Sequence, residues 1–557
     1  MTGLKPVGLW NEGDWIVVIT LGVFALFLLG GGWIASRKEP EALGHPKGLY
    51  MLFFAEMWER FSYYGMRALL IFYLTKHWLF ADAKANLVYG AYTSLVYITP
   101  VLGGYLADRY LGQRRAVLFG GILLMCGHFL MAVEGTGGQS DPTINVFWTA
   151  LAFIIVGSGF LKANISVMVG QLYRLTDTRR DGAYTIFYMG INLGAAVGTI
   201  LVGYLGETIG WAYGFGLAGI GMLAGLIVFV IGRPALHGAG EPPTRLAKHT
   251  EWTLYAVGLA AVGVIWALVQ YQDVIQTLLI ISGLMLLGYV LYEAFKLDKQ
   301  PRERIFAILF LIALNPVFWG LFEQAGGSIN LYTDRFVDRA GVPASLFQSI
   351  NPIYILVLAP IFAALWVILG KRNLEPSAPA KFALALFQVG AGFLVFVWGA
   401  NAFPVGDEAK TAVLFVFLLY LLHTTGELCL SPVGLSAMNR LAPPFMASLI
   451  MGAWFYMTAV GNFVAGKIGE ATGGHSGEMT KETTLEVYNT IGWWTVGIGA
   501  VVLALSPLVK RWMHLDTLSD DDRLAGRPEL AEPQAAGIDT RGEVKADGRP
   551  GPSPAGS

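Results

Sequence analysis

Four charged residues lie close together in an otherwise apolar stretch, EMWERFSYYGMR, at residues 56–67. In a helix, positions spaced i, i+3, i+4, i+7, i+8 and i+11 share one face. The residues on that face are Glu56, Glu59, Arg60, Tyr63, Tyr64 and Arg67. Burying even one such charge against lipid costs about 2.5–3.5 kcal/mol on insertion scales, so we expect this face to contact protein or a water-filled cavity. A cluster of ion pairs that only stabilises helix packing is the alternative.

Three further charges interrupt other apolar stretches: Lys162 in GFLKANIS, Glu323 in FWGLFEQAGGS and Glu427 in GELCLSP. All seven charges are nearly balanced in sign and come from four distant segments, a pattern that favours one shared central site. Polar and aromatic residues expected at the same site are Tyr97, Asn192, Trp319, Asn351, Trp454 and Phe455.

The sequence offers little for other chemistry. A lone histidine in a membrane span, such as His128, is more often a hydrogen-bonded packing residue, whereas His423 precedes Glu427 by one helical turn and both interpretations stay open for it. HExxH and GxSxG motifs are absent, so we do not expect an enzyme. Both cysteines, Cys126 and Cys429, lie in apolar stretches, which argues against a disulfide framework, a metal site or a bound cofactor.

Composition indicates that these charges lie in membrane spans. The chain has 557 residues, of which 55% are hydrophobic and 14% charged, and its mean hydropathy is +0.55. These values are typical of an all-α, polytopic protein in a lipid bilayer. The net charge of -1, with Lys and Arg spread over short segments, argues against a nucleic-acid partner. About fifteen spans are expected, near 14–36, 48–76, 88–107, 115–134, 145–173, 183–206, 211–232, 251–271, 275–296, 304–333, 346–369, 380–402, 411–432, 447–470 and 487–511.

The charges of the short loops predict the orientation. Segments such as SRKEPEALGHPK, DRYLGQRR and KLDKQPRER carry two or more Lys or Arg, whereas EGTGGQSDP, LGETIG and YQD carry none. Basic segments alternate along the chain with segments that lack Lys and Arg, so the basic side is expected in the cytoplasm. An odd number of spans then places the N-terminus outside and the C-terminal tail inside. This tail is rich in Asp, Pro and Gly and is expected to be disordered.

Several motifs together resemble the proton-dependent oligopeptide transporters of the major facilitator superfamily. They are ExxERFSYYGMR, GFLKANIS, FYMGINLGA, FWxxFEQ, QSINP and GELCLSPVGLS, in that order between residues 48 and 511. The loop GGYLADRYLGQRR resembles the loop signature of the superfamily as a whole. The resemblance implies a major facilitator fold of two six-helix bundles, joined by a helical hairpin common in bacterial members. It also implies a bacterial plasma (inner) membrane and function as a monomer. The expected domains are an extra N-terminal helix with its linker at 1–47, bundles at 48–232 and 304–511, the hairpin region at 233–303 and the tail at 512–557.

The resemblance also implies roles for individual residues. Arg60 and Lys162 are expected at the peptide carboxylate, with Tyr64 and Tyr97 lining that end, and Glu427 and Ser431 at the peptide ammonium. Tyr63 and Arg67 are also expected to bind the substrate. Asn192 and Asn351 are expected to bond the peptide backbone, while Trp319, Trp454 and Phe455 line side-chain pockets. Glu56, Glu59 and Glu323, with Arg60 and Lys162, are expected to carry or relay protons, and Glu323 also to line the site.

Elementary chemistry agrees with this division of roles. A peptide is a zwitterion, so a cavity of low dielectric must offer a cation at one end, an anion at the other and amide partners between them. Each residue adds at most about 3.3–3.6 Å of extended length, so fixed charges on two bundles favour di- and tripeptides. We therefore expect a proton-coupled symporter that imports di- and tripeptides by alternating access. A transporter of the same family for another amphoteric or anionic small solute is the alternative.

Overall fold

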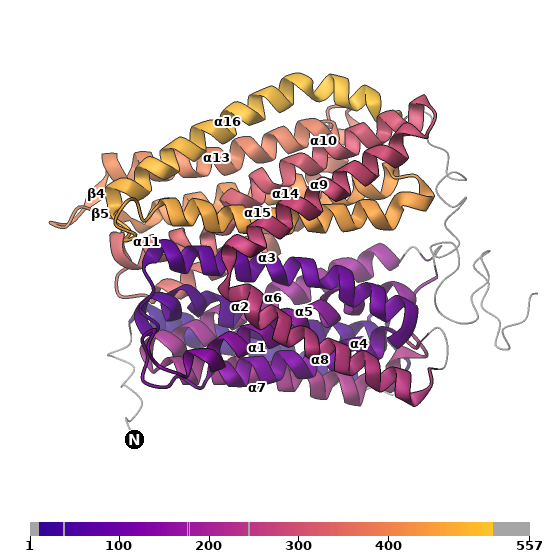
Figure 1. Cartoon of the computed structure of the whole chain (residues 1–557), viewed down its shortest axis with the longest axis horizontal. Helices are drawn as coiled ribbons and strands as arrows, with labels where there is room; N and C mark the ends of the chain where they lie inside the picture. Colours follow the sequence, from indigo (N-terminus) through magenta and orange to yellow (C-terminus); the bar gives the residue numbers. More distant parts are fainter. Residues whose placement is uncertain (1–10, 37–38, 175–176, 178, 243–245, 516–557) are drawn as a thin grey trace, which may run out of the picture.

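The protein folds into two groups of long helices that lie against each other along their length (Figure 1). This computed structural model describes residues 11–36, 39–174, 177, 179–242 and 246–515, so the predicted disordered tail lies almost wholly outside the described residues. The helices of the first bundle are α2 (Lys47–Phe72), α3 (Asp82–Leu106), α4 (Gln113–Met131), α5 (Ile144–Gln171), α6 (Arg180–Thr208) and α7 (Trp211–Gly232). Those of the second bundle are α10 (Lys299–Phe322), α11 (Ser328–Phe336), α12 (Ile350–Lys371), α13 (Ala378–Ala402), α14 (Val413–Leu441), α15 (Ala447–Ala471) and α16 (Lys481–Trp512).

Thirteen of the described helical segments are long and apolar enough to cross a membrane. Helices α2 and α3 are not among these thirteen, although the sequence predicts spans at both places. Helix α2 carries the four charges of EMWERFSYYGMR. A span recognised by its apolar character alone has at most two charged residues in 18. The charges that make α2 atypical as a lipid-facing span are those predicted to face protein or a cavity.

Helix α2 lies at the centre of the first bundle because α6 approaches its backbone closely. A Cβ atom on Gly194 would lie 2.1 Å from the carbonyl oxygen of Met57, and one on Gly198 would lie 2.2 Å from that of Phe61. Only glycine allows two membrane helices to pack at this distance. The close contact fixes the rotation of α2, and its charged face is therefore turned away from lipid.

The first span of the second bundle is broken in the middle. Helix α10 ends at Phe322, a 3-10 turn follows at Glu323–Gly326, and α11 continues the span. Such breaks are tolerated at membrane depth only where the backbone is buried in protein or lines a cavity. The break places Glu323 at the end of a helix, facing the first bundle.

Two helices between the bundles form a hairpin, α8 (Lys248–Gln270) and α9 (Gln272–Phe295). Helix α8 packs on α5, whereas α9 contacts α10 and α15, so the hairpin runs across the junction of the bundles (Figure 1). The hydroxyl of Tyr456 on α15 donates to the carbonyl of Leu279 and lies 2.8 Å from the hydroxyl oxygen of Ser282 on α9. The hairpin thus contacts both bundles.

The extra N-terminal helix, α1 (Glu12–Ser36), lies on the surface of the first bundle beside α2 and α6. The ring of Phe24 packs edge-on against Trp58 at 5.3 Å, and Asp14 accepts a hydrogen bond from the hydroxyl of Tyr204. Most of its other side chains face outward, as expected for a helix with one side in lipid.

Short strands add little to the architecture. Strands β1 (Glu41–Ala42) and β2 (His45–Pro46) form a small antiparallel pair before α2. Strands β3 (Val337–Asp338), β4 (Pro404–Val405) and β5 (Lys410–Ala412) form a three-stranded sheet of order β3-β5-β4 beyond α11. The sheet marks one end of the molecule, at the left of Figure 1.

The bundles touch most closely where α3 crosses α15. A Cβ atom on Gly90 would lie 2.5 Å from the Cα atom of Gly466, and one on Gly469 would lie 2.5 Å from the side-chain oxygen of Asn86. No side chain separates the two backbones at this point. The contact therefore sets the distance between the bundles near the end that carries the sheet.

Candidate binding cavity

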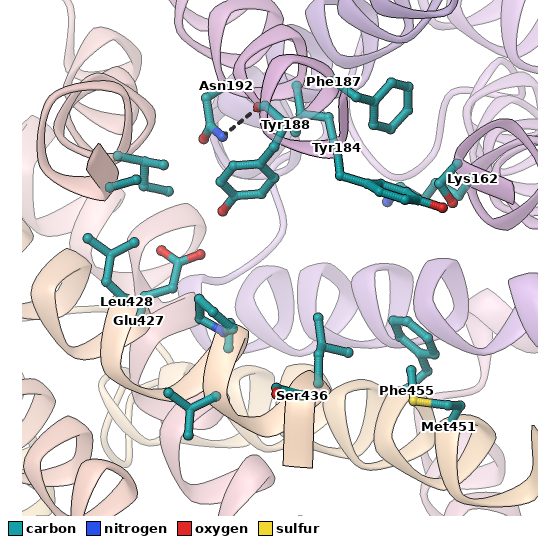
Figure 2. A pocket seen from close by; sticks show the side chains of 18 of the residues that line it. Lys162, Tyr184, Phe187, Tyr188, Asn192, Glu427, Leu428, Ser436, Met451 and Phe455 are labelled. Atoms are coloured by element: carbon teal, nitrogen blue, oxygen red, sulfur yellow. Dashed lines mark hydrogen bonds between the residues drawn. The ribbon is translucent and has the colours of Figure 1, made fainter. Parts of the chain in front are cut away.

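A cavity of about 2250 Å³ separates the two bundles. Helices α2, α3, α5 and α6 contribute one wall, and α10, α12, α14 and α15 contribute the other. Figure 2 shows Lys162, Tyr184 and Tyr188 on one side and Glu427 with Phe455 on the other. The residues predicted for the site that line this cavity are Glu56, Arg60, Tyr64, Arg67, Tyr97, Lys162, Asn192, Trp319, Glu323, Asn351, Glu427, Ser431 and Phe455.

On α2, one arginine holds both acids. Arg60 Nε lies 2.7 Å from Glu56 Oε1 and 3.1 Å from Glu59 Oε2, and both glutamates are only 1% exposed. Glu59 lies behind Arg60 and does not reach the cavity. When both carboxylates are ionised, this buried group has one positive and two negative charges. A single proton on either acid would make the group neutral.

Lys162 on α5 forms no ion pair with any of the described residues. Its Nζ atom has no hydrogen-bond partner among the described residues and lies 4.0 Å above the ring of Tyr63 and 4.8 Å above that of Tyr97. The two aromatic faces stabilise the cation partly, as cation–π contacts do. The ammonium group therefore stays available for an anion that enters the cavity.

On the second bundle, a side-chain amide and not a cation contacts Glu427. Its Oε2 atom accepts a hydrogen bond of 3.0 Å from Asn351 Nδ2, and the same amide donates to the hydroxyl of Thr424 at 2.9 Å. In the described part of the chain no lysine or arginine pairs with Glu427. This carboxylate faces the cavity without an opposite charge, as Lys162 does on the other wall.

Glu323 behaves differently, because it is paired across the bundles. Arg67 on α2 donates to its carboxylate, and the Nε atom of Arg67 donates to the hydroxyl of Tyr89 on α3. Both members of this ion pair are buried. Arg67 and Glu323 therefore connect the two bundles deep in the cavity, between the C-terminal part of α2 and the break after α10.

Asn192 on α6 lines the wall of the cavity opposite the one that carries Glu427 (Figure 2). Its Nδ2 atom donates to the backbone carbonyl of Tyr188 at 3.0 Å (Figure 2), which leaves its side-chain oxygen directed toward the cavity. Tyr188 lines the cavity beside it, and its hydroxyl points toward the wall that carries Glu427. Sequence reasoning missed Tyr188, although its place one helical turn before Asn192 was a usable signal.

Three predicted residues do not reach the cavity. Glu59 and Tyr63 are buried directly behind Arg60 and Lys162. Trp454 is 4% exposed and packs inside the second bundle near Phe382, so its predicted place in a side-chain pocket is wrong. The next residue on α15, Phe455, takes that place, because one step along a helix rotates a side chain by about 100°.

The two histidines stay outside the cavity as well. His128 is buried in α4, and neither of its ring nitrogens has a hydrogen-bond partner among the described residues, which differs from the expected hydrogen-bonded packing role. The ring of His423 lies 5.0 Å from that of Phe393, inside the second bundle. Within the described residues no group of three His, Cys, Asp or Glu side chains gathers as metal ligands would.

Ion pairs between the bundles close the end of the cavity near the sheet. Arg335 on α11 donates to both carboxylate oxygens of Asp82 on α3, at 2.5 and 2.7 Å, and Lys76 pairs with Asp334 at 2.7 Å. The backbone N–H of Met479 also donates to Asp82. We call these contacts the outer latch. Sequence reasoning missed it, because its members lie far apart along the chain.

A second contact closes the same end beside α1. The carboxylate of Glu207, at the end of α6, accepts a hydrogen bond of 2.7 Å from the backbone N–H of Ser345 in the second bundle. The opposite end of the cavity is lined by Asp108, Arg109 and Arg440 near the basic loops. The cavity is therefore closed at one end, and we call its other end the mouth.

Comparison with known proteins identifies this architecture. A profile of the POT family matches residues 114–485. The chain belongs to the POT family. It is 38% identical to the peptide transporter YePEPT of Yersinia enterocolitica over 76% of this chain and 88% of the relative. It is 30% identical to the dipeptide and tripeptide permease B of Photorhabdus luminescens over 86% of this chain and 99% of the relative.

Solved structures of the family agree with the fold. The crystal structure of a peptide transporter POT in complex with alafosfalin superimposes with a TM-score of 0.75 at 36% identity, covering 86% of this chain and 98% of that one. The predicted major facilitator fold is therefore confirmed. This POT family member is a multi-pass membrane transporter and not an enzyme, as the sequence predicted.

Proposed function

We propose that the protein is a proton-coupled symporter that imports di- and tripeptides by alternating access. The observation that carries the proposal is the pair of unmatched charges that face one cavity from different bundles, Lys162 and Glu427. A zwitterion with its carboxylate toward Lys162 and its ammonium toward Glu427 supplies both missing partners. The names of the two curated relatives support a peptide as that zwitterion.

The middle of the cavity fits a peptide backbone. Asn192 and Asn351 project amides from opposite walls, next to Tyr188 and Glu427. Burial of a peptide group without hydrogen bonds is costly, so amide partners between the charged ends favour peptides over simple amino acids. Trp319 and Phe455 supply aromatic surface for the side chains of the substrate.

The cluster on α2 supports proton coupling. Arg60 is held by Glu56 and Glu59 together, and a proton on either acid frees part of the guanidinium for the substrate carboxylate. Glu323 has the same relation to Arg67 across the bundles, so its protonation weakens the connection between them. No cofactor besides the coupling proton is needed, because a membrane potential supplies about 2.3 kcal/mol per charge per 100 mV.

The membrane arrangement follows from the loop charges. The mouth lies at the end with the basic segments, which the positive-inside rule places in the cytoplasm of a bacterium. The outer latch then faces outside, and the N-terminus lies on that same side. The bundles of one chain enclose the whole cavity, which supports function as a monomer.

Uptake by proteoliposomes tests the proposal directly. The purified full-length chain, reconstituted in liposomes, should accumulate labelled dialanine above its external concentration only when an inward proton gradient is imposed. Accumulation that ignores the gradient would remove proton coupling. If dialanine is neither taken up nor able to compete for the cavity, the alternative of another amphoteric or anionic solute takes its place.

A further inference from the structure

A second pair of donors lines the cavity between its centre and the mouth. Arg180, the first residue of α6, and Tyr184, one turn later, both belong to the lining. A Cβ atom on Gly170 of α5 would lie 2.5 Å from the hydroxyl oxygen of Tyr184 and 3.1 Å from Arg180 Nη2. Two hydrogen-bond donors therefore converge over one glycine, where any larger residue would displace them.

Among the residues whose side chains are described, none forms an ion pair with the guanidinium of Arg180. Its Nε atom is buried and has no hydrogen-bond partner among the described residues. The preceding residue, Arg179, is the opposite case, because it pairs with Asp177 at 2.9 Å and with Glu41 at 3.3 Å. Other acids of the mouth are already engaged, since Asp108 accepts from Gln113 and Glu375 from Lys381. A positive group that lines a cavity without a counterion is a place for a ligand anion.

The spacing along α5 connects this place to the central site. Lys162, Ser166 and Gly170 are four residues apart and all line the cavity, so they form one row on one helix face. The eight residues from Lys162 to Gly170 correspond to about 12 Å along the helix axis. Three extended peptide residues span about 10–11 Å. A carboxylate that leaves Lys162 therefore meets the next cation after moving by about the length of one substrate.

We propose that Arg180 and Tyr184, seated over Gly170, form an exit subsite that binds the carboxylate of the substrate on its way from Lys162 to the mouth. The inference rests on the proposed peptide transport and adds a second anion site to it. A long apolar stretch between the centre and the mouth would leave the carboxylate without a partner and raise the barrier to release. The guanidinium lowers that barrier, because it can accept the carboxylate in a bidentate pair before water does.

Release of labelled dialanine from preloaded proteoliposomes tests the subsite, together with equilibrium binding of dialanine to the purified full-length protein. Arg180→Gln should slow release through the mouth about tenfold, the loss expected for one charge-assisted hydrogen bond at the rate-limiting step. Its affinity for dialanine should stay within about twofold, because Lys162 and Arg60 still bind the carboxylate at the centre. Arg180→Lys should restore most of the release rate, because lysine brings back the positive charge, although it lacks the paired donors of the guanidinium.

Two further variants separate the subsite from the fold. Gly170→Ala keeps both donors, but its methyl group would occupy the space over which they lie and displace them. It should therefore slow release, as Arg180→Gln does. Arg179→Gln is the matched control, because it removes a neighbouring guanidinium that is ion-paired outside the cavity, and it should release at the wild-type rate. Dialanine amide, which lacks the carboxylate, should leave wild type and Arg180→Gln equally fast.

Three results would overturn the exit subsite: unchanged release from Arg180→Gln, an equal loss of release and affinity, or equal slowing of dialanine and its amide. A lower melting temperature of Arg180→Gln with parallel losses in both assays would assign Arg180 to packing. Wild-type protein that neither binds nor releases dialanine would contradict the proposed function itself, which is a separate outcome.

Discussion

The outer latch and the central cavity use the same residue types in opposite ways. In the latch, each charge that reaches across the bundles meets an opposite charge, as Asp82 meets Arg335 and Lys76 meets Asp334. In the cavity, Lys162 and Glu427 face each other's bundle, and among the described residues neither forms an ion pair. The latch is therefore complete without a ligand, whereas the cavity is completed only by one.

The difference follows from what each charge must do during a transport cycle. Ion pairs near the surface cost little to break, because water replaces the lost partner. A charge kept unpaired inside a cavity pays for desolvation until an opposite charge arrives. Binding of a zwitterion relieves that cost at both ends at once, which gives the substrate a differential interaction with the closed arrangement of the bundles.

The largest expected effect comes from Glu59, the acid beside the cavity that we expect to carry the coupling proton. Glu59→Gln mimics the protonated acid permanently and leaves Arg60 with Glu56 alone. Uphill uptake of dialanine driven by a proton gradient should fall to the level of protein-free liposomes, while peptide-for-peptide exchange persists. Loss of both activities would instead indicate a purely structural ion cluster.

The matched control for this change is Glu482→Gln on the exposed first turn of α16, which should transport as wild type does. Glu56→Gln and Lys162→Ala should resemble Glu59→Gln. If Glu59→Gln still drives uphill uptake, the proton site moves to Glu323 or Glu427.

The next effect concerns the unmatched acid on the second bundle. Glu427→Gln should lower the affinity for dialanine about 10- to 100-fold, because a hydrogen bond to a charged group contributes about 1.5–3 kcal/mol. Binding of N-acetyl-dialanine, which has no ammonium group, should change much less in an equilibrium binding assay. Equal losses for both ligands would show that Glu427 does not bind the ammonium.

A smaller effect is expected when the outer latch is weakened. Arg335→Gln should shift the population toward an open outer end by about fivefold, since a pair that is partly exposed contributes about 1 kcal/mol. Distances between spin labels at Leu79→Cys and Asp407→Cys, both exposed near that end, would report the shift. Asp82→Asn combined with Arg335→Gln should shift it no further than either change alone, and an additive shift would show that the two residues do not act as a pair.

The smallest expected effect is a pH dependence of the same latch. Partial burial and the nearby carboxylate of Asp82 raise the pKa of Glu478, which lies in the loop before α16, above its ordinary value of 4.5. The closed latch therefore binds a proton at Glu478 more tightly than the open one, and closure is favoured as the pH falls toward and through this pKa. Glu478→Gln should flatten the pH dependence of the spin-label distances above pH 4.5. An unchanged profile would exclude Glu478 as the titrating group.

Sequence reasoning anticipated the helical architecture, and most of the residues that it assigned to the site line the cavity, for one physical reason. A charge in an apolar span can only face protein or water, so Arg60, Lys162, Glu323 and Glu427 were forced toward a shared interior. The same reasoning placed α2 among the membrane spans, although its charges exclude it when spans are recognised by hydropathy alone.

What the sequence did not reveal depends on helix rotation and on contacts between distant segments. Trp454 and Phe455 are neighbours of similar chemistry, and only the packing of α15 decides which of them reaches the cavity. The lack of a hydrogen-bond partner for Lys162 Nζ among the described residues, and the pairing of Asp82 with Arg335, both depend on how distant segments pack together. No periodicity within one helix carries that information.

The contact of Gly90 with Gly466 divides helix α3 into two unequal lengths. From Gly90, helix α3 extends sixteen residues toward the mouth and eight toward the latch, or about 24 Å and about 12 Å at 1.5 Å per residue. If the bundles rotate about this point, a tilt of about 10° moves the mouth by about 4 Å and the latch end by about 2 Å. Under such a rotation the end of α3 at the mouth would move about twice as far as its end at the latch. The position of one glycine pair along α3 would thus determine how wide the mouth becomes for a given closure of the latch.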